Sequence, residues 1–381
     1  MRVALLATVT DFGGIEQVLL TLLQRMDREV ELFPVLFTRR DADQLAFFAH
    51  LQSLGVPHVT YVNDRKRRYL NFFRNVRHAI ATFATERFDL VHCHGYRADL
   101  LGCIVSTCFG VPAVATVHGF IPNDRYLRLY RRLDLALLRR FAKVMAVSGQ
   151  IKEELVGGGV APDRVEVITN GIAWASARDR EGSRREIRAQ LGISEDDFVF
   201  GFVGRLSEEK GLTCLLRSLQ GLSAAGGARC RALLVGDGPQ RSALERLATG
   251  LGVGANVAFA GFQANPSRWY AAMDAFVLPS LTEGTPMALL EAMAHQLPVI
   301  ATAVGGVPGM LAHQESGILV PPSEPDRLRD AMRSVAGNPE LRLRLGERAA
   351  RTVRQQFDAD GWTRRVRDVY VGAIQRAGAV A

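Results

Sequence analysis

The sequence has 381 residues, 48% of them hydrophobic, and a formal net charge of +8 at pH 7. This length exceeds one ordinary hydrophobic core and predicts two domains of ordinary size. The longest apolar runs are only strand-length, which argues against a membrane-spanning helix. The positive charge favours an acidic partner, such as a nucleotide, a nucleic acid or an anionic lipid.

The five cysteines include no C-x-x-C pair and no cluster with histidine at metal-binding spacing, which predicts buried thiols in a reducing compartment. The apolar run Val3–Val9 is short for a signal peptide, and Asp11-Phe12-Gly13-Gly14 follows it in place of a cleavage site. We therefore interpret this run as a first strand and expect a cytoplasmic protein.

Apolar runs and helical patterns alternate along the whole chain. Near-continuous apolar runs of this kind are typical of parallel strands covered on both faces by helices. The expected strands are Val3–Val9, Val30–Phe37, Val56–Val62, Phe88–His94, Val111–His118, Ala142–Ser148 and Arg164–Thr169, then Phe198–Gly204, Arg231–Gly236, Asn256–Gly261, Ala275–Ser280, Leu297–Thr302 and Gly317–Val320. The order predicts an α/β fold with two doubly wound domains, which bind ligands at the carboxyl ends of their strands.

The polar stretch Trp174–Gly182 separates the two sets of strands. We expect a first domain over residues 1–170, a linker and the start of the second domain over 171–194, a second domain over 195–356, and a last helix over 357–381. The natural ligand site of such a pair is the cleft between them.

The first strand leads into the loop Asp11–Glu16, where Gly13 and Gly14 allow backbone amides to approach a ligand at a helix start. The G-x-G-x-x-G fingerprint of dinucleotide binding is absent. On local grounds a plain strand-to-helix turn, with Glu16 favourable in the first turn, is the stronger interpretation.

Two strand ends carry histidines. His118 ends one expected strand and is a candidate to donate to a hydroxyl group, although a lone histidine is more often a satisfied polar residue. His92 and His94 end the strand before it. Because alternate residues point to opposite faces, the His-Cys-His run does not converge on one metal, and His94 is the weaker ligand candidate.

The segment Arg125–Lys143 predicts an amphipathic helix with tyrosines and leucines on one face and Arg125, Arg128, Arg132 and Arg139 on another. This is the pattern of a helix at a membrane surface. A helix packed on its own sheet explains it equally well. A second basic run, Arg65–Arg68, lies in the same half. Nucleic acid is disfavoured, since no recognition motif surrounds these residues.

The loop Gly204–Gly211 follows the first strand of the second half, and its Arg205 and Lys210 form a reasonable clamp for a diphosphate. The plainer alternative is a solvated loop, in which both pair with Glu208 and Glu209.

The stretch Glu283–Glu291 places two carboxylates eight positions apart, separated by Gly284, Thr285, Pro286 and Met287. Glycine and proline here predict a tight loop that feeds a helix over about Pro286–His295, with Pro286 at its first position. The helix N-terminus suits a phosphate. The two acids fit a ligand that is both anionic and rich in hydroxyls, such as a nucleotide-sugar.

Around this stretch the chain resembles the retaining glycosyltransferases of family 4, which have the GT-B fold. Further matches, in the expected order, are Gly13–Glu16, His118-Gly119, Asn170–Ile172, Gly204–Leu206 with Lys210-Gly211, Gly236–Pro239 and Gly305–Pro308. The resemblance implies that Arg205 and Lys210 bind the diphosphate, Glu291 the ribose, and Glu283 with the Gly284–Met287 backbone the sugar. It makes His118, Glu283, Arg205 and Lys210 the catalytic set, with Gly13 and Gly14 near the donor phosphates and Glu16 and His94 on the acceptor side.

The resemblance implies a retaining transfer from a UDP- or GDP-sugar to a glycan or lipid-linked acceptor, for polysaccharide or glycolipid synthesis, with no cofactor and no metal. Asp41-Ala42-Asp43 and Asp358-Ala359-Asp360 match the D-x-D metal signature of the other glycosyltransferase fold, but each precedes a helical pattern and is better explained as a cap. Two alternatives stay open: a nucleotide-sugar epimerase of the same fold, and a two-lobed sugar-binding protein. A membrane-surface location is expected if Arg125–Lys143 is interfacial.

Overall fold

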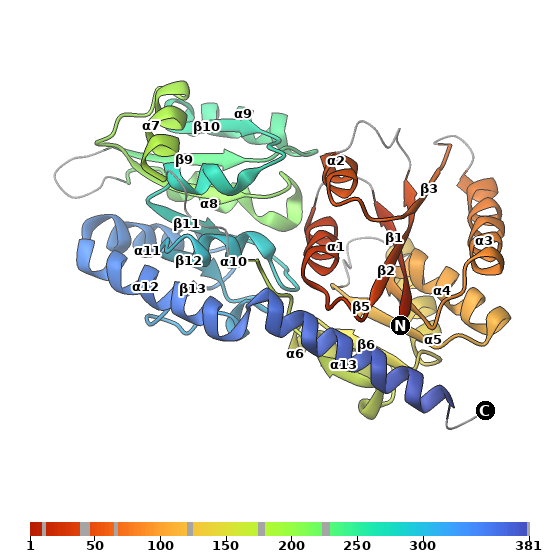
Figure 1. Cartoon of the computed structure of the whole chain (residues 1–381). Coiled ribbons are helices and arrows are strands. Elements are labelled where there is room, and N and C mark those ends of the chain that lie inside the picture. Colours follow the sequence, from red (N-terminus) through yellow and green to blue (C-terminus); the bar gives the residue numbers. More distant parts are fainter. Residues whose placement is uncertain are drawn as a thin grey trace. The chain divides into compact units, whose positions relative to one another are not determined.

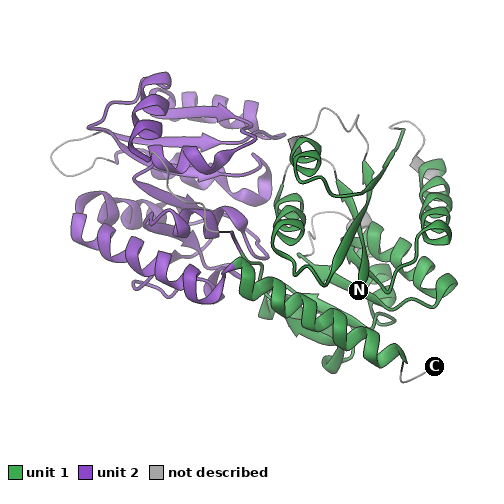
Figure 2. Cartoon of the chain, in the orientation of Figure 1, with its two compact units in different colours: residues 1–171, 359–381 green, residues 172–358 purple. Residues whose placement is uncertain are grey.

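The computed structural model describes residues 1–9, 13–38, 46–64, 68–119, 125–173, 180–222 and 229–378, with only the backbone for residues 46, 68, 69 and 125–129. The chain divides into two compact units (Figure 2). Unit 1 comprises residues 1–171 and 359–381, and unit 2 comprises residues 172–358.

Unit 1 is built on a seven-stranded parallel sheet with strand order β3-β2-β1-β4-β5-β6-β7. Its strands are β1 (Arg2–Val9), β2 (Glu31–Thr38), β3 (Val59–Val62), β4 (Leu90–His94), β5 (Ala113–Val117), β6 (Lys143–Ala146) and β7 (Val165–Val167). Its helices are α1 (Gly14–Arg25), α2 (Ala46–Ser53), α3 (Arg68–Thr85), α4 (Tyr96–Phe109), α5 (Arg125–Leu138), α6 (Gly149–Gly157) and α13 (Ala359–Gly378).

The strand order of unit 1 reverses between β1 and β4. Right-handed crossovers then place α1 and α2 on one side of the sheet and α3, α4 and α5 on the other, as Figure 1 shows. All residues of β4 and β5 are buried, which explains why their sequences are almost uninterrupted apolar runs.

Helix α13 lies against unit 1, although it follows unit 2 in the sequence. It contacts α1 and β5, and Arg367 at its middle pairs with Asp27 at 2.9 Å. Tyr370 is fully buried and reaches His92 of β4. The carboxyl-terminal helix is therefore part of the unit 1 core.

Unit 2 is built on a six-stranded parallel sheet with strand order β10-β9-β8-β11-β12-β13. Its strands are β8 (Phe198–Val203), β9 (Cys230–Val235), β10 (Val257–Gly261), β11 (Ala275–Leu278), β12 (Val299–Thr302) and β13 (Ile318–Val320). Its α-helices are α7 (Arg180–Gln190), α8 (Leu212–Ser218), α9 (Arg241–Gly250), α10 (Met287–Ala294), α11 (Pro325–Gly337) and α12 (Pro339–Gln356). The order reverses between β8 and β11.

Every apolar run that the sequence predicted as a strand overlaps one of these strands, so the predicted α/β class of two doubly wound sheets is confirmed. Helix α7 is fixed to unit 2 by Arg188, which is fully buried. Its guanidinium pairs with Asp274 at 2.7 Å and donates to the carbonyl of Ala272 at 3.1 Å. A buried charge is tolerated here because it has both an ionic partner and hydrogen-bond acceptors.

Candidate functional site

Both sheets place chemically active residues where their strand order reverses. In unit 2 the loop after β8 carries Arg205 and Lys210, and the loop after the neighbouring β11 carries Glu283. In unit 1 the loop after β1 carries Gly13, and His94 ends the neighbouring β4. In doubly wound sheets this reversal leaves a crevice at the carboxyl ends of the strands, and ligands bind there.

Two glycines allow the loops of unit 2 to approach closely. Gly211 has φ +63°, and a Cβ atom there would lie 2.0 Å from the carbonyl oxygen of Pro279. Gly305, after β12, has φ +56°, and its Cβ would lie 1.7 Å from the carbonyl oxygen of Glu283. Neither distance is possible for a side chain, so both positions require glycine. These contacts bring the loops after β8, β11 and β12 together.

Lys210 and Glu283 meet across two of these loops. Lys210 Nζ lies 2.7 Å from Glu283 Oε1, which also accepts from the Ser280 hydroxyl at 2.6 Å. The Glu283 side chain is only 7% exposed. The solvated-loop alternative, in which Lys210 pairs with Glu208 or Glu209, is therefore wrong for Lys210, and Glu209 instead accepts from Ser207. The pair unites the two positions that the sequence assigned to the diphosphate and the sugar.

Arg205 differs from Lys210. Its side chain is exposed, and within the described part of the chain it takes no hydrogen bond or ion pair. An exposed guanidinium whose five N–H donors have no partner among the described residues is well suited to bind an anion from solvent.

Glu291 is buried, at 9% exposure, and its Oε2 accepts a 2.6 Å hydrogen bond from the Tyr270 hydroxyl. Tyr270 stacks on His295, with ring centroids 5.1 Å apart, and burial together with the neighbouring Glu291 carboxylate raises the pKa of its hydroxyl well above 10. Tyr270 therefore holds Glu291 as a donor. No motif in the sequence pointed to this partner, because Tyr270 belongs to a separate 3-10 helix, Pro266–Ala272.

The loop between the two carboxylates continues into α10. Pro286 has φ −69° and ψ 110°, so it is the extended residue that precedes the helix. The prediction that Pro286 occupies the first helical position is therefore wrong. Thr285 and Met287 are buried beside it, while Gly284 is partly exposed. The first amides of α10 point toward the loop, since helical N–H groups face the N-terminus.

In unit 1 the start of α1 is closed on itself. The backbone N–H of Gly13 donates to Glu16 Oε2 at 3.1 Å, and Glu16 is buried. This is the plain strand-to-helix turn that local reasoning favoured. Gly13 and Gly14 are exposed, and residues 11 and 12 of the predicted loop lie outside the described residues.

His118 follows β5 and contacts His94, with Nδ1 of His94 3.1 Å from Nε2 of His118. Beneath them, His92 exchanges hydrogen bonds with the Tyr370 hydroxyl at 2.7 Å and the Thr116 hydroxyl at 2.8 Å. Burial lowers the pKa of His92 to about 3 and that of His118 to about 4, and it lowers the pKa of His94 well below 6.5. All three imidazoles are neutral at pH 7.

The predicted membrane helix is α5. Asp134, Leu135 and Leu138 are buried, whereas Leu133 is 54% and Tyr130 is 37% exposed. Of the four arginines, Arg132 is exposed, and Arg139 donates to the carbonyl of Gly158 at the end of α6, at 2.7 Å. The side chains of Arg125 and Arg128 lie outside the described residues, as do Arg65–Arg67.

Within the described ranges no three histidine, cysteine, aspartate or glutamate side chains converge as a metal site. Asp41–Asp43 lies outside those ranges. Asp360 is in the first turn of α13, 3.6 Å from Arg25. No described helix is long and apolar enough to span a membrane.

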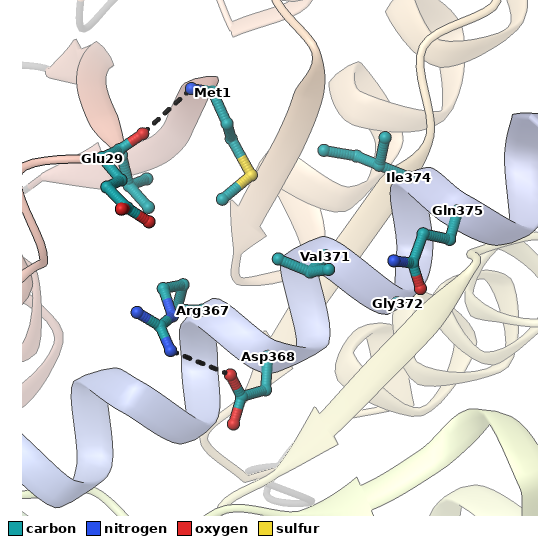
Figure 3. A pocket seen from close by; sticks show the side chains of 9 residues that line it. Met1, Glu29, Arg367, Asp368, Val371, Gly372, Ile374 and Gln375 are labelled. Carbon is teal, nitrogen blue, oxygen red and sulfur yellow. Dashed lines mark hydrogen bonds and ion pairs between the residues drawn. The ribbon is translucent and has the colours of Figure 1, made fainter.

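A hollow of about 700 Å³ lies at the opposite end of the unit 1 sheet, at the amino ends of β1 and β2. Figure 3 shows Met1 and Glu29 facing Arg367 and Asp368 of α13 across it. The charged contacts beside it are formed within the protein, such as the ion pair of Arg367 in α13 with Asp27 after α1. Since parallel sheets bind ligands at their carboxyl ends, we place the candidate site there and not at this hollow.

Two doubly wound domains, with glycine-rich loops and charged side chains at the carboxyl ends of both sheets, define the GT-B class of fold. The structure is similar to that of Anabaena HepE in complex with UDP and glucose, with a TM-score of 0.84 and 24% identity over 97% of this chain and 98% of that one. It is also similar to sucrose-phosphate synthase of Thermosynechococcus elongatus, with a TM-score of 0.78 and 21% identity over 100% of both chains.

Residues 12–173 match the family model Glycosyltransferase Family 4, and residues 183–352 match Glycosyl transferases group 1. The D-inositol 3-phosphate glycosyltransferase of Saccharomonospora viridis is 31% identical over 309 residues, 75% of this chain and 70% of that protein. That of Thermomonospora curvata is 29% identical over an alignment of 406 positions, which covers 97% of this chain and 93% of that protein. The chain belongs to the family 4 glycosyltransferases, and it is a glycosyltransferase of the GT-B fold.

Proposed function

We propose that this enzyme transfers a sugar from a UDP- or GDP-sugar to a glycan or lipid-linked acceptor and retains the configuration at the anomeric carbon. The observation that carries the proposal is the convergence of Lys210, Arg205 and Glu283 at the strand reversal of unit 2, beside the start of α10. Cations and a helix N-terminus suit a diphosphate, and a buried carboxylate suits sugar hydroxyls.

Each residue has a separate role in this proposal. Arg205, which is exposed and unpaired among the described residues, takes up the incoming diphosphate together with Lys210 and the amides that begin α10. Glu291 accepts hydrogen bonds from the ribose hydroxyls, with its carboxylate oriented by Tyr270. Glu283 and the Gly284–Met287 backbone hold the sugar, and His118 donates to one of its hydroxyls. Unit 1 binds the acceptor, with Glu16 on that side and with Gly13 and Gly14 near the donor phosphates.

Charge neutralisation at the diphosphate requires no metal. When the bond between the anomeric carbon and the phosphate oxygen breaks, negative charge develops on the leaving diphosphate. Lys210 and Arg205 stabilise that charge, which is electrostatic stabilisation of the transition state. Loss of a diphosphate contact should therefore lower turnover.

Retention of configuration usually depends on a carboxylate nucleophile. Glu283 is a poor nucleophile here, because its Oε1 is held by both Lys210 and Ser280. We therefore favour a front-face reaction. The acceptor oxygen bonds to the anomeric carbon on the side from which the diphosphate leaves, and the acceptor proton passes to the leaving phosphate oxygen.

We further propose that unit 1 docks on anionic membrane and so reaches a lipid-linked acceptor. Helix α3 exposes Phe73 by 72% and Leu70 by 56%, and α5 exposes Leu133 by 54%. The α3/α5 face, defined as these three residues with Arg74, Arg77 and Arg132, combines apolar and basic side chains, and both helices contact α4. That composition suits a surface at the boundary between lipid headgroups and acyl chains.

The reaction is tested by incubating the enzyme with a panel of nucleotide-sugars and candidate acceptors, and by measuring nucleoside diphosphate release and the anomeric configuration of the product by NMR. We expect release that depends on acceptor and a product with the donor's configuration. Conversion of a nucleotide-sugar without acceptor would identify an epimerase instead, and an inverted product would exclude the front-face reaction.

A further inference from the structure

The hydrogen bond between His94 and His118 can be formed in two ways, because either ring can carry the shared hydrogen atom. Both rings are neutral near pH 7, and a neutral imidazole has one N–H donor and one bare nitrogen acceptor. Across the 3.1 Å between His94 Nδ1 and His118 Nε2, one ring must donate and the other accept. The arrangement decides which nitrogen of His118 is left to meet a substrate.

The other nitrogen of His94 distinguishes the two arrangements. His94 is 3% exposed, and its Nε2 is buried with no hydrogen-bond partner among the described residues. If His94 carried its hydrogen on Nε2, a buried N–H would be left without an acceptor. Buried N–H groups without an acceptor are rarer in proteins than buried acceptors that lack a donor. The hydrogen of His94 therefore belongs on Nδ1, which donates to His118.

His118 is fixed by this contact. Since its Nε2 accepts from His94, its single hydrogen must be on Nδ1. Within the described part of the chain, Nδ1 of His118 has no hydrogen-bond partner, and His118 is only partly buried at the carboxyl end of β5. This nitrogen is the one that meets ligand at the strand ends.

We propose that His94 is a positioning residue that holds His118 as its Nδ1–H tautomer, so that His118 donates a hydrogen bond from Nδ1 to a substrate hydroxyl. The inference rests on the proposed function for the identity of that hydroxyl, but not for the tautomer itself. This positioning role replaces the direct acceptor contact that the family resemblance implied for His94, since both ring nitrogens of His94 are buried.

The surroundings of His94 support a fixed neutral state. The titratable groups that face it are His92 of β4, His118 after β5 and Tyr370 of α13, which bonds to His92. Burial raises the pKa of Tyr370, and it lowers the pKa of each of the three histidines. These groups are uncharged near pH 7, so among the described residues the tautomer is set by hydrogen bonding and not by a nearby ion.

The tautomer is measured directly by two-bond ¹H–¹⁵N correlation NMR of the full chain labelled with ¹⁵N-histidine, with His118→Gln to assign the signals. We expect His118 protonated on Nδ1 in the wild type. His94→Phe keeps a ring but removes the donor, so His118 should then show the other tautomer or a mixture. His94→Asn places an amide N–H near the position of Nδ1 and should restore the Nδ1–H form.

Kinetics supply the second arm. Loss of one well-placed hydrogen bond corresponds to about a threefold to tenfold fall in turnover, so we expect that fall in His94→Phe, with an unchanged donor Michaelis constant and recovery in His94→Asn. A wild-type His118 protonated on Nε2 would overturn the proposal, as would an Nδ1–H form that persists in His94→Phe. The wild-type spectrum decides even if a variant fails to fold. A tautomer that behaves as expected without any sugar transfer would leave the positioning role supported and the proposed reaction wrong.

Discussion

Lys210 Nζ lies 2.7 Å from Glu283 Oε1, and this ion pair joins the loops that follow β8 and β11, the two strands between which the order of the unit 2 sheet reverses. A diphosphate bound by Lys210 would lie beside the carboxylate that we assign to the sugar. The pair therefore joins the cation proposed to bind the diphosphate to the carboxylate proposed to recognise the sugar.

Arg205→Ala and Lys210→Ala should each impair use of the donor. A charge-assisted contact to phosphate contributes about 1.5–3 kcal/mol, so we expect roughly a tenfold to hundredfold loss in kcat/KM. Because Arg205 has no side-chain partner among the described residues, its replacement should leave the thermal unfolding midpoint unchanged. Arg246→Ala, at an exposed position on α9, is the matched control. If both variants use the donor with wild-type kinetics, the diphosphate does not bind at this loop.

The two carboxylates should have different kinetic effects. Glu283→Gln should mainly lower kcat if its contact tightens in the transition state, whereas Glu291→Gln should mainly raise the donor KM, since ribose binding is the same in both states. Tyr270→Phe removes only the hydrogen bond that orients Glu291 and should raise the donor KM less than Glu291→Gln does. An intact kcat in Glu283→Gln with weakened donor binding would show that the sugar lies elsewhere. Circular dichroism confirms that the variants fold.

The α3/α5 face should bind anionic vesicles at low salt. Each basic side chain near such a surface contributes about 1 kcal/mol and is screened by salt. Phe73→Ser combined with Leu133→Ser, or Arg74, Arg77 and Arg132 all replaced by Gln, should abolish cosedimentation with phosphatidylserine vesicles. Arg139 is excluded from this set, because its contact with Gly158 stabilises the end of α6. Leu343→Ser, at a residue of unit 2 that is 65% exposed, is the control. A wild-type enzyme that stays in solution with these vesicles would show that the face is not a membrane surface.

Acid should weaken the folded state of unit 1 through histidines whose pKa is lowered in the folded protein. The pKa of His92 is lowered from 6.5 to about 3 and that of His118 to about 4, both by burial. Below pH 6.5 the unfolded chain binds protons that the folded chain does not, so the free energy of unfolding falls as pH falls from about 6.5 to about 4. The slope is about 1.4 kcal/mol per pH unit for each histidine. Urea unfolding at pH 7 and pH 5 should show the loss, and it should be smaller in His92→Phe but not in the exposed control His50→Gln. Equal losses in His92→Phe and the wild type would contradict this origin.

The sequence predicted the fold because its signals are local. Strands such as β4 and β5 are buried on both faces and appear as uninterrupted apolar runs. Glycines such as Gly211 and Gly305 lie where one loop approaches the backbone of another. The site was predicted only in part. Arg205, Lys210, Glu283 and Glu291 were found by spacing and family resemblance.

Their partners were not found, because these come from distant positions. Ser280 and Tyr270 carry no motif, and the pairing of Lys210 with Glu283 joins residues 73 positions apart. The sequence also could not predict which side chains of α5 face solvent. Leu133 is exposed, but an amphipathic pattern fits an apolar face packed on the sheet equally well. The sequence likewise does not show that Arg188, which belongs to a highly charged helix, is fully buried against Asp274.

The most direct test of the account is titration of the wild-type enzyme with UDP-sugars, GDP-sugars, the corresponding diphosphates and the free nucleosides, by thermal unfolding and calorimetry. A ligand that binds only the folded protein stabilises it by about 2.7 kcal/mol at a concentration of one hundred times its Kd. We expect one nucleotide class to raise the unfolding midpoint, its diphosphate to bind far more tightly than its nucleoside, and the combined Arg205→Ala and Lys210→Ala variant to lose that difference. Equal binding of diphosphate and nucleoside, or tight diphosphate binding that survives in the double variant, would contradict a donor site at the carboxyl ends of β8 and β11.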